Sequence, residues 1–291
     1  MSRTIAYYCG GKKCCLELLV ALFSLRQHYK GNITVCLGQT SNQYLAPLLA
    51  SNDVEVISVP NSDKDYSLQD HWSTRWRAMA LVDHDQVLHP DCDTTVEHPI
   101  DHLFDLINPD REFITSYYGY QDDGKPYWKW NDHLKNYAKI APVDDLVPLY
   151  FAFGLIGWNK GWPWFQEVAD NVKYTITDEC SMSYTLMRHG RKGCMAKVDP
   201  SDFRLSRAYY RLQPKEFYDT KMWHFAGGGG SGYQLWWKKL LEARAVNAFN
   251  LADDEYLKFL DPSSYKKWIT NTWPSSTYAD HRKRDGLPCD P

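Results

Sequence analysis

The chain has 291 residues, of which 44% are hydrophobic and 24% charged, a composition typical of a globular protein with a large buried core. Its formal net charge at pH 7 is −3, so no overall positive field favours nucleic acid as a partner. The eight cysteines form no Cys-x-x-Cys pair, which argues against both a zinc ribbon and a disulfide framework. Reduced thiols are the simpler expectation.

The most apolar stretch of the sequence, Leu16 to Leu25, contains Glu17 and is followed by Arg26. This stretch is too short and too polar to span a bilayer, and no signal peptide precedes the first expected strand. We therefore expect a cytoplasmic protein without a transmembrane segment.

The first third of the sequence alternates short apolar runs with longer amphipathic ones. We expect strands at 3–8, 32–38, 54–59 and 86–88, and helices at 13–29, 42–51 and 73–81. This alternation predicts an α/β fold with a Rossmann-like, mostly parallel central sheet flanked by helices. Ligands of such sheets bind beyond the carboxyl ends of the strands.

The pattern after residue 94 is less regular and predicts a smaller mixed-sheet part and a helical C-terminal region. We expect strands at 111–117, 149–158, 193–198 and 222–226, helices at 99–106, 163–172, 178–189 and 233–245, and a surface insertion at 121–136. One domain is expected over residues 1–270. It divides into residues 1–93 and residues 94–270, before a tail at 271–291.

Two carboxylates separated by one residue, Asp91 and Asp93, directly follow the expected strand at 86–88 and its His89-Pro90 end. Carboxylates at such a turn can converge on one hard cation, because Mg²⁺ and Mn²⁺ prefer oxygen ligands and are often shared with substrate phosphates. Two neighbouring aspartates alone are a weak signal, and the position at a strand end gives them weight.

Longer segments resemble a known group of proteins. The stretch RWRAMALVDHDQVLHPDCDTTVEHPIDHLFD is similar to the central part of GT-A fold glycosyltransferases, especially the glycogenin and bacterial lipopolysaccharide galactosyltransferase family. Further segments resemble that family in the same order: IAYYCGGKKCCLELLVALFSLRQHY, YFAFGLIGWNKG, TDECSMSYTLMRHG and WHFAGG. The resemblance extends from about residue 3 to residue 240 and implies a single GT-A domain.

The resemblance also implies roles for individual residues. The implied metal ligands are Asp91, Asp93 and His224, with Mn²⁺ or Mg²⁺ as the cofactor. The implied contacts of the nucleotide sugar are Tyr7, Tyr8, Cys9, Arg75, Asp91, Cys92, Gly154, Gly227 and Gly228. The implied catalytic carboxylates are Asp178 and Glu179.

Several of these residues also have another interpretation. His224 could be a core histidine at a strand end, and Tyr8 a packed core tyrosine. Arg77 is the alternative to Arg75 for the donor contact. Asp178 and Glu179 could simply cap the helix that they begin.

The function implied by the resemblance is transfer of a hexose or pentose from a nucleoside diphosphate sugar, with UDP favoured, to a glycan or protein-linked acceptor, with retention of configuration. A Lys-Pro-Trp sequence that normally follows the family's His-x-x-Gly is missing here, which leaves the sugar and the stereochemistry open. Two alternatives are a sugar-phosphate nucleotidyltransferase, for which Gly10-Gly11-Lys12-Lys13 is a weak signal, and a non-catalytic nucleotide-sugar-binding module.

Overall fold

The computed structural model describes residues 1–60, 67–108, 112–116, 152–174, 177–189, 195–205, 214–225, 233–252 and 255. The chain forms two compact units that alternate along the sequence. The first unit comprises Met1–Gly10, Gly31–Pro90 and Asp101–Asp199, and the second comprises Gly11–Lys30, Asp91–Ile100 and Pro200–Pro291. The expected insertion at 121–136 and tail at 271–291 lie outside the described residues, and the proposed division at residue 93 stays a prediction.

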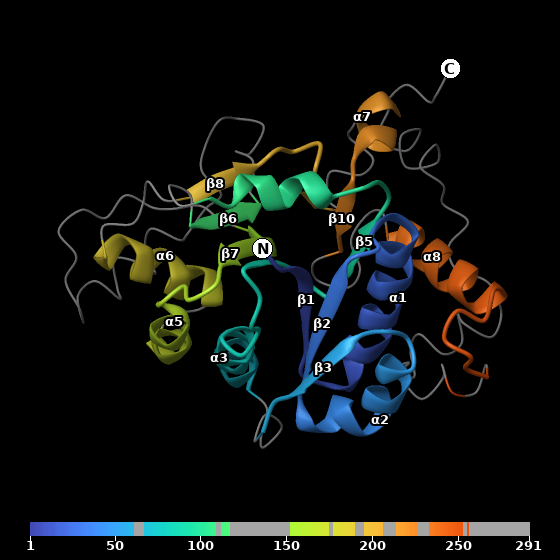
Figure 1. Ribbon diagram of the computed structural model, residues 1–291, viewed down its shortest axis with the longest axis horizontal. Coiled ribbons are helices and arrows are strands. Elements are labelled where there is room, and N and C mark those ends of the chain that lie inside the picture. Colours follow the sequence, from blue (N-terminus) through green and yellow to red (C-terminus); the bar gives the residue numbers. More distant parts are fainter. Residues whose placement is uncertain are drawn as a thin grey trace. The chain divides into compact units, whose positions relative to one another are not determined.

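The first unit is built on a seven-stranded sheet in the order β3-β2-β1-β4-β7-β6-β8 (Figure 1). The neighbours β3, β2, β1 and β4 run parallel, as do β6 and β8, whereas β7 runs antiparallel to both β4 and β6. The strands are β1 (Arg3–Cys9), β2 (Asn32–Leu37), β3 (Glu55–Ser58), β4 (Gln86–Pro90), β6 (Phe113–Ser116), β7 (Ala152–Asn159) and β8 (Met195–Val198). The expected mostly parallel α/β sheet is confirmed.

The described part of the first unit also contains four α-helices and two 3₁₀ helices. These are α2 (Gln39–Ala50), α3 (Leu68–Met79), η1 (Asp101–Leu106), α5 (Phe165–Asn171), η2 (Val172–Tyr174) and α6 (Asp178–Arg188). Helix α3 begins five residues before the expected start at residue 73. The cause is a capping box, in which the Ser67 side chain accepts from Asp70 N and the Asp70 side chain accepts from Ser67 N. These contacts satisfy backbone groups that the first helical turn would otherwise leave unpaired.

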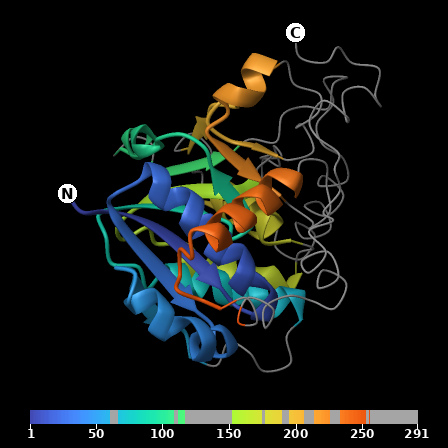
Figure 2. The same cartoon turned by 90° about the vertical axis from the view of Figure 1, so that its right-hand side faces the viewer.

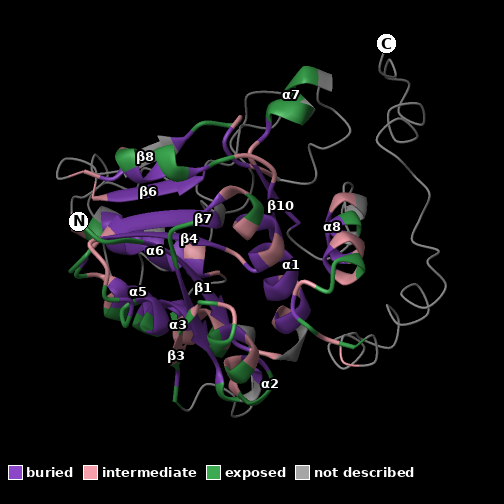
Figure 3. Cartoon of the chain, turned by 45° about the vertical axis from the view of Figure 1, so that its right-hand side comes forward, coloured by how far each residue is buried: buried purple, intermediate pink, exposed green. Residues whose placement is uncertain are grey.

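Large aromatic side chains fill the core on the side of the sheet where α3 and α5 pack. Phe165 meets Trp158 and Trp162 edge-on, with ring centroids 5.0 and 4.8 Å apart, and Trp76 lies against Phe165 at 6.1 Å. Edge-to-face pairs of this kind add directional stabilisation to the burial of their surface. Figure 3 shows the buried middle of β7, where residues 154–158 are all buried. This packing fixes α3, and with it Arg75, against the sheet.

The described part of the second unit contains a three-stranded sheet in the order β5-β10-β9 and three helices. Its elements are α1 (Lys12–His28), β5 (Thr94–Val96), β9 (Arg204–Leu205), α7 (Pro214–Asp219), β10 (Met222–His224) and α8 (Tyr233–Ala245). Helices α1 and α8 lie side by side (Figure 2). Val96 N donates to Ser24 Oγ at 3.0 Å, so α1 is also bonded to β5.

Most expected elements are present, with shifted ends. Strand β4 continues through His89 to Pro90, because both residues pair with β7 opposite Ile156 and Leu155. Proline has no N–H to donate to a neighbouring strand, so it is tolerated here at the last position of β4. The sequence analysis missed three short elements: β5, β9 and α7. None of the described helices is both long enough and apolar enough to cross a bilayer.

Candidate functional site

A cluster of three ligand-type side chains lies in the second unit, at the start of β5. Asp91 and Asp93 occupy the turn before this strand, and the Thr94 hydroxyl donates to the Asp91 carbonyl at 2.8 Å. Strand β10 pairs antiparallel with β5, with His224 opposite Thr94, and Phe225 N donates to Asp93 O at 2.8 Å. The pairing of β5 with β10 therefore places the His224 imidazole next to the Asp91 and Asp93 carboxylates, which are far from it in the sequence.

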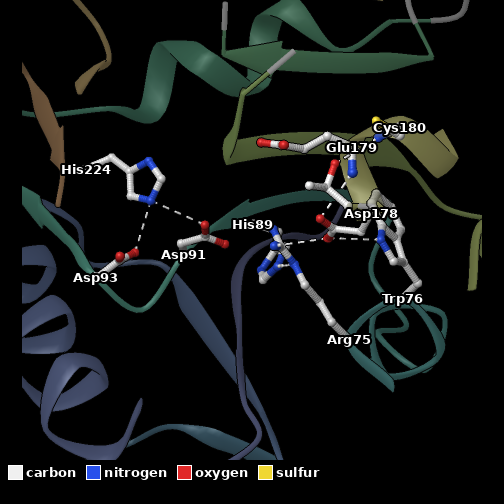
Figure 4. A network of polar contacts seen from close by, with 10 residues as sticks. Arg75, Trp76, His89, Asp91, Asp93, Asp178, Glu179, Cys180 and His224 are labelled. Carbon is white, nitrogen blue, oxygen red and sulfur yellow. Dashed lines mark hydrogen bonds and ion pairs between the residues drawn. The ribbon is translucent and has the colours of Figure 1, made fainter. Parts of the chain in front are cut away.

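The three side chains converge closely enough to share one ion. His224 Nε2 lies 3.4 Å from Asp91 Oδ2 and 3.1 Å from Asp93 Oδ1 (Figure 4). One candidate ligand atom from each residue lies within 4.8 Å of the other two. His224 is buried, whereas about a quarter of each aspartate side chain is exposed. An ion could thus reach the carboxylates from solvent.

Electrostatics hold a proton at this cluster when no ion is present. Burial opposes a charge on His224, but the nearby Asp93 and Asp91 carboxylates outweigh it and raise its pKa to about 10. Two carboxylates and an imidazole fit Mn²⁺, and also Mg²⁺, which prefers an all-oxygen set. A divalent cation would displace the imidazole proton, since metal ligands bind in their deprotonated forms.

A second polar network is buried in the first unit, around Arg75 of α3. Arg75 Nε donates to His89 Nε2 at 2.9 Å, and Arg75 Nη1 lies 3.5 Å from Asp178 Oδ2 (Figure 4). Trp76 Nε1 donates to the same Asp178 oxygen at 3.3 Å. Strand β4, helix α3 and the start of α6 supply these groups. Arg77, by contrast, lies at the surface in an ion pair with Asp170.

The two expected catalytic carboxylates differ in their surroundings. Asp178 is buried within the Arg75 network, and its Oδ1 also accepts from Glu179 N at 3.1 Å. Glu179 is partly exposed. The contact typical of an N-cap is made instead by Thr177, whose Oγ1 accepts from Cys180 N at 3.3 Å. Arg75 and Trp76 account for further contacts of Asp178.

The remaining predicted donor contacts are mostly buried. Tyr7, Tyr8 and Cys9 at the end of β1 are at most 5% exposed, and the Tyr8 ring packs in the core with its centroid 5.2 Å from that of His71. Cys92 is buried in the acidic turn. Gly154 lies in β7 where the pairing with β6 shifts register, between the partners of Thr115 and Ser116. Gly227 and Gly228 lie outside the described residues.

The sequence analysis missed His89, which it treated only as the end of a strand. The available signal was a histidine directly after the apolar pair Val87-Leu88 and two residues before Asp91. A hollow of about 440 Å³, lined by Glu112, Trp162, Trp164 and the turn at 159–161, was also not foreseen. It lies where β7 ends, opposite the start of β4, because Asn159 pairs with Gln86.

Comparison with solved structures identifies the fold class. The apo bifunctional glycosyltransferase WbbM matches with a TM-score of 0.53 at 14% identity, over 82% of this chain and 49% of that chain. The galactosyltransferase LgtC, solved with donor and acceptor sugar analogs, matches with a TM-score of 0.58 at 15% identity, over 88% of this chain and 100% of that chain. The glycosyltransferase GlyE of Streptococcus pneumoniae TIGR4 matches with a TM-score of 0.55 at 12% identity, over 95% and 66%.

These neighbours are GT-A glycosyltransferases, and the chain has their fold. It spans about half the length of WbbM and all of LgtC. No protein-family model matches the sequence, and no curated protein matches it.

Proposed function

We propose that this chain is a metal-dependent glycosyltransferase. It transfers a hexose or pentose from a nucleoside diphosphate sugar, with a UDP-sugar favoured, to a hydroxyl group of a glycan or protein-linked acceptor. The observation that carries the proposal is the convergence of Asp91, Asp93 and His224 in a chain with the GT-A fold. Two of the three residues come from the turn after β4, the kind of strand end at which α/β sheets bind ligands.

We assign the cation to these three side chains, with Mn²⁺ favoured over Mg²⁺ because an imidazole accompanies the carboxylates. When bound there, a divalent ion neutralises the diphosphate that leaves the sugar. The role of the protein is to hold His224 Nε2 at 3.4 Å from the Asp91 carboxylate and 3.1 Å from the Asp93 carboxylate before the ion arrives. The β5–β10 ladder provides this preorganisation.

The donor contacts remain those that the sequence motifs indicate. We assign Arg75 to the diphosphate or the sugar, since a guanidinium presents donors in a fixed fork. The other proposed contacts are Tyr7, Tyr8, Cys9, Asp91, Cys92, Gly154, Gly227 and Gly228. The burial of Tyr8 favours contact through its edge or its neighbours' backbone over stacking of its full ring face on uracil.

The carboxylates at the start of α6 have separate proposed roles. Glu179 is partly exposed and is the better candidate to face the anomeric carbon, where it would stabilise positive charge in an oxocarbenium-like transition state. Asp178 is held by Arg75 and Trp76, so we assign it to positioning Arg75.

Retention of anomeric configuration follows the family resemblance. The cytoplasmic setting also stays a prediction.

The proposal is tested by assaying hydrolysis and transfer from UDP- and GDP-sugars, with free Mn²⁺ controlled by a chelator. We expect turnover that requires the divalent ion and is abolished in Asp93→Ala. Asp105→Asn is the matched control, because it changes a carboxylate in an exposed ion pair with Arg3. Unchanged turnover in Asp93→Ala would overturn the metal-dependent mechanism.

The same assay separates the alternatives. Release of pyrophosphate from a nucleoside triphosphate and a sugar phosphate would support a nucleotidyltransferase. Binding of a nucleotide sugar without turnover across the acceptors would support a non-catalytic binding module.

A further inference from the structure

The contact between Arg75 and His89 fixes the protonation pattern of the imidazole. Arg75 Nε–H can only donate, so His89 Nε2, at 2.9 Å, must carry a lone pair. His89 Nδ1 lies 2.8 Å from the carbonyl oxygen of Ala6, which can only accept, so the ring proton is on Nδ1. The pair of contacts therefore selects one neutral tautomer of His89.

The sheet holds this ring rigidly. Ala6 belongs to β1, which pairs in parallel with β4, so the acceptor of Nδ1–H is part of the neighbouring backbone. The Trp158 ring of β7 packs edge-on against the His89 ring, with an angle of 66° between the ring planes and the centroids 6.3 Å apart. His89 is 1% exposed. Turning the ring over would break both hydrogen bonds in a place where water cannot replace them.

A second contact of the guanidinium, with Asp178, is looser. Arg75 Nη1 lies 3.5 Å from Asp178 Oδ2, an oxygen that also accepts from Trp76. A distance of 3.5 Å is at the limit of a useful hydrogen bond, whereas 2.9 Å is typical of a good one. Of these two partners, His89 therefore determines the position of Arg75 more tightly, and it does so without adding a second negative charge.

We propose that His89 is a positioning residue of the transfer reaction: its neutral ring holds the Arg75 guanidinium in the orientation in which Arg75 contacts the nucleoside diphosphate sugar. This inference rests on the proposed function, because it takes the donor contact of Arg75 from there. A residue that orients a binding group without touching the ligand itself typically contributes about 10–100-fold to affinity or activity. His89 would act on the donor through its contact with Arg75.

The test compares His89→Leu with His89→Gln in the full chain. Leucine has no acceptor, so we expect the donor kcat/KM for UDP-glucose or UDP-galactose, whichever the wild type uses, to fall about 10–100-fold. The acceptor KM and the Mn²⁺ affinity should stay within about 2-fold of wild type, as expected for a group that does not touch either. Glutamine can place an amide oxygen near the position of Nε2, so it should restore donor kcat/KM to within about 5-fold of wild type.

A matched control separates positioning from general loss of packing. Thr4→Val removes a buried hydroxyl that bonds to Thr34 in the same sheet, at 3.0 Å, without touching Arg75. We expect this variant to keep the donor kcat/KM of the wild type. A second readout does not depend on turnover: ¹⁵N spectra of the imidazole should show His89 with a protonated Nδ1 and a bare, hydrogen-bonded Nε2.

The outcomes distinguish the two proposals. An active wild type whose His89→Leu variant keeps full donor kcat/KM refutes the role of His89 and leaves the proposed function intact. Equal losses in His89→Leu, His89→Gln and Thr4→Val, or a parallel loss of Mn²⁺ affinity, also refute it. A protonated Nε2 in the spectra refutes the contact itself. A wild type inactive with every donor refutes the proposed function, and with it the reaction role of His89.

Discussion

His224 pairs with Thr94 across the antiparallel ladder of β5 and β10. This register places the His224 imidazole 3.1 Å from Asp93, the residue directly before Thr94. A shift of one residue would turn the imidazole to the other face of the strand, because side chains alternate along a ladder. The candidate metal centre thus depends on strand pairing as much as on the acidic turn.

Replacing His224 with alanine should remove one of three ligands and leave both carboxylates. We expect Mn²⁺ affinity to fall by more than the roughly 10–100-fold that loss of an outer-shell partner costs. Isothermal titration of Mn²⁺ into the protein measures this directly. His98→Ala is the control, since His98 bonds to the Tyr218 carbonyl, and equal losses in both variants would contradict the assignment of His224.

Lys239 is the charged centre of the packing between α8 and α1. Its ammonium group lies 3.1 Å from Glu97, 3.6 Å from Glu242 and 3.2 Å from the Gln27 amide oxygen, and its side chain is 10% exposed. Lys239→Met leaves Glu97 without this cation in a site that is only 20% exposed. We expect a loss of about 2–3 kcal/mol in the free energy of unfolding, below the full cost for a completely buried pair.

The neighbouring Lys238 provides the control for Lys239. It is 71% exposed and lies 3.9 Å from Glu242, so Lys238→Met should change the free energy of unfolding by less than about 0.5 kcal/mol. Urea denaturation followed by fluorescence would measure both variants. A similar effect of the two substitutions would contradict the prediction, because it would show that the buried ion pairs of Lys239 add nothing to the free energy of unfolding.

Gly157 in β7 has no room for a side chain. A Cβ atom there would lie 2.9 Å from Ile114, from Leu88 and from the Val87 carbonyl oxygen. Alanine usually stabilises a strand relative to glycine by reducing unfolded-chain entropy, by about 0.4–1 kcal/mol. Overpacking should outweigh this gain and cost about 1–3 kcal/mol. Thermal unfolding of Gly157→Ala checks the sign, and an unchanged or higher Tm would contradict it.

Two buried thiols should be inert in the folded protein. Burial raises the pKa of Cys36 to about 12, with a smaller contribution from Glu55, and burial is also the main cause of the pKa of about 12 for Cys180. Both groups stay protonated between pH 7 and 9, and only the thiolate reacts. At pH 8, alkylation should be about a thousandfold slower than in the guanidinium-unfolded chain. Rapid labelling of either residue in the native protein, mapped by mass spectrometry, would contradict this.

The parallel half of the sheet and the three candidate metal ligands could be predicted from the sequence. The alternation of strands and helices up to residue 88 could be predicted because it depends on local residue preferences. Asp91 and Asp93 could be predicted because they come shortly after an expected strand. The assignment of His224 came from resemblance, and the structure shows what brings it there: β5, a three-residue strand too short to have a periodicity of its own.

The Arg75 network could not be predicted in the same way. His89, Arg75 and Asp178 come from three elements, and their contacts depend on how α3 and α6 pack on the sheet. The early start of α3 was missed because residues 67–70 carry capping contacts and no clear apolar period. Whether the metal ligands bind an ion and whether Glu179 faces a sugar stay predictions.

Calorimetric titration of UDP, with Mn²⁺ present and with Mn²⁺ removed by a chelator, tests the central claim most directly. Because Asp91, Asp93 and His224 would hold a divalent ion that offsets the negative charge of the diphosphate, we expect UDP to bind at least about tenfold more tightly with Mn²⁺. This gain should disappear in Asp93→Asn. UDP binding that is equally tight with and without Mn²⁺, or a full Mn²⁺ effect retained in Asp93→Asn, would contradict the account.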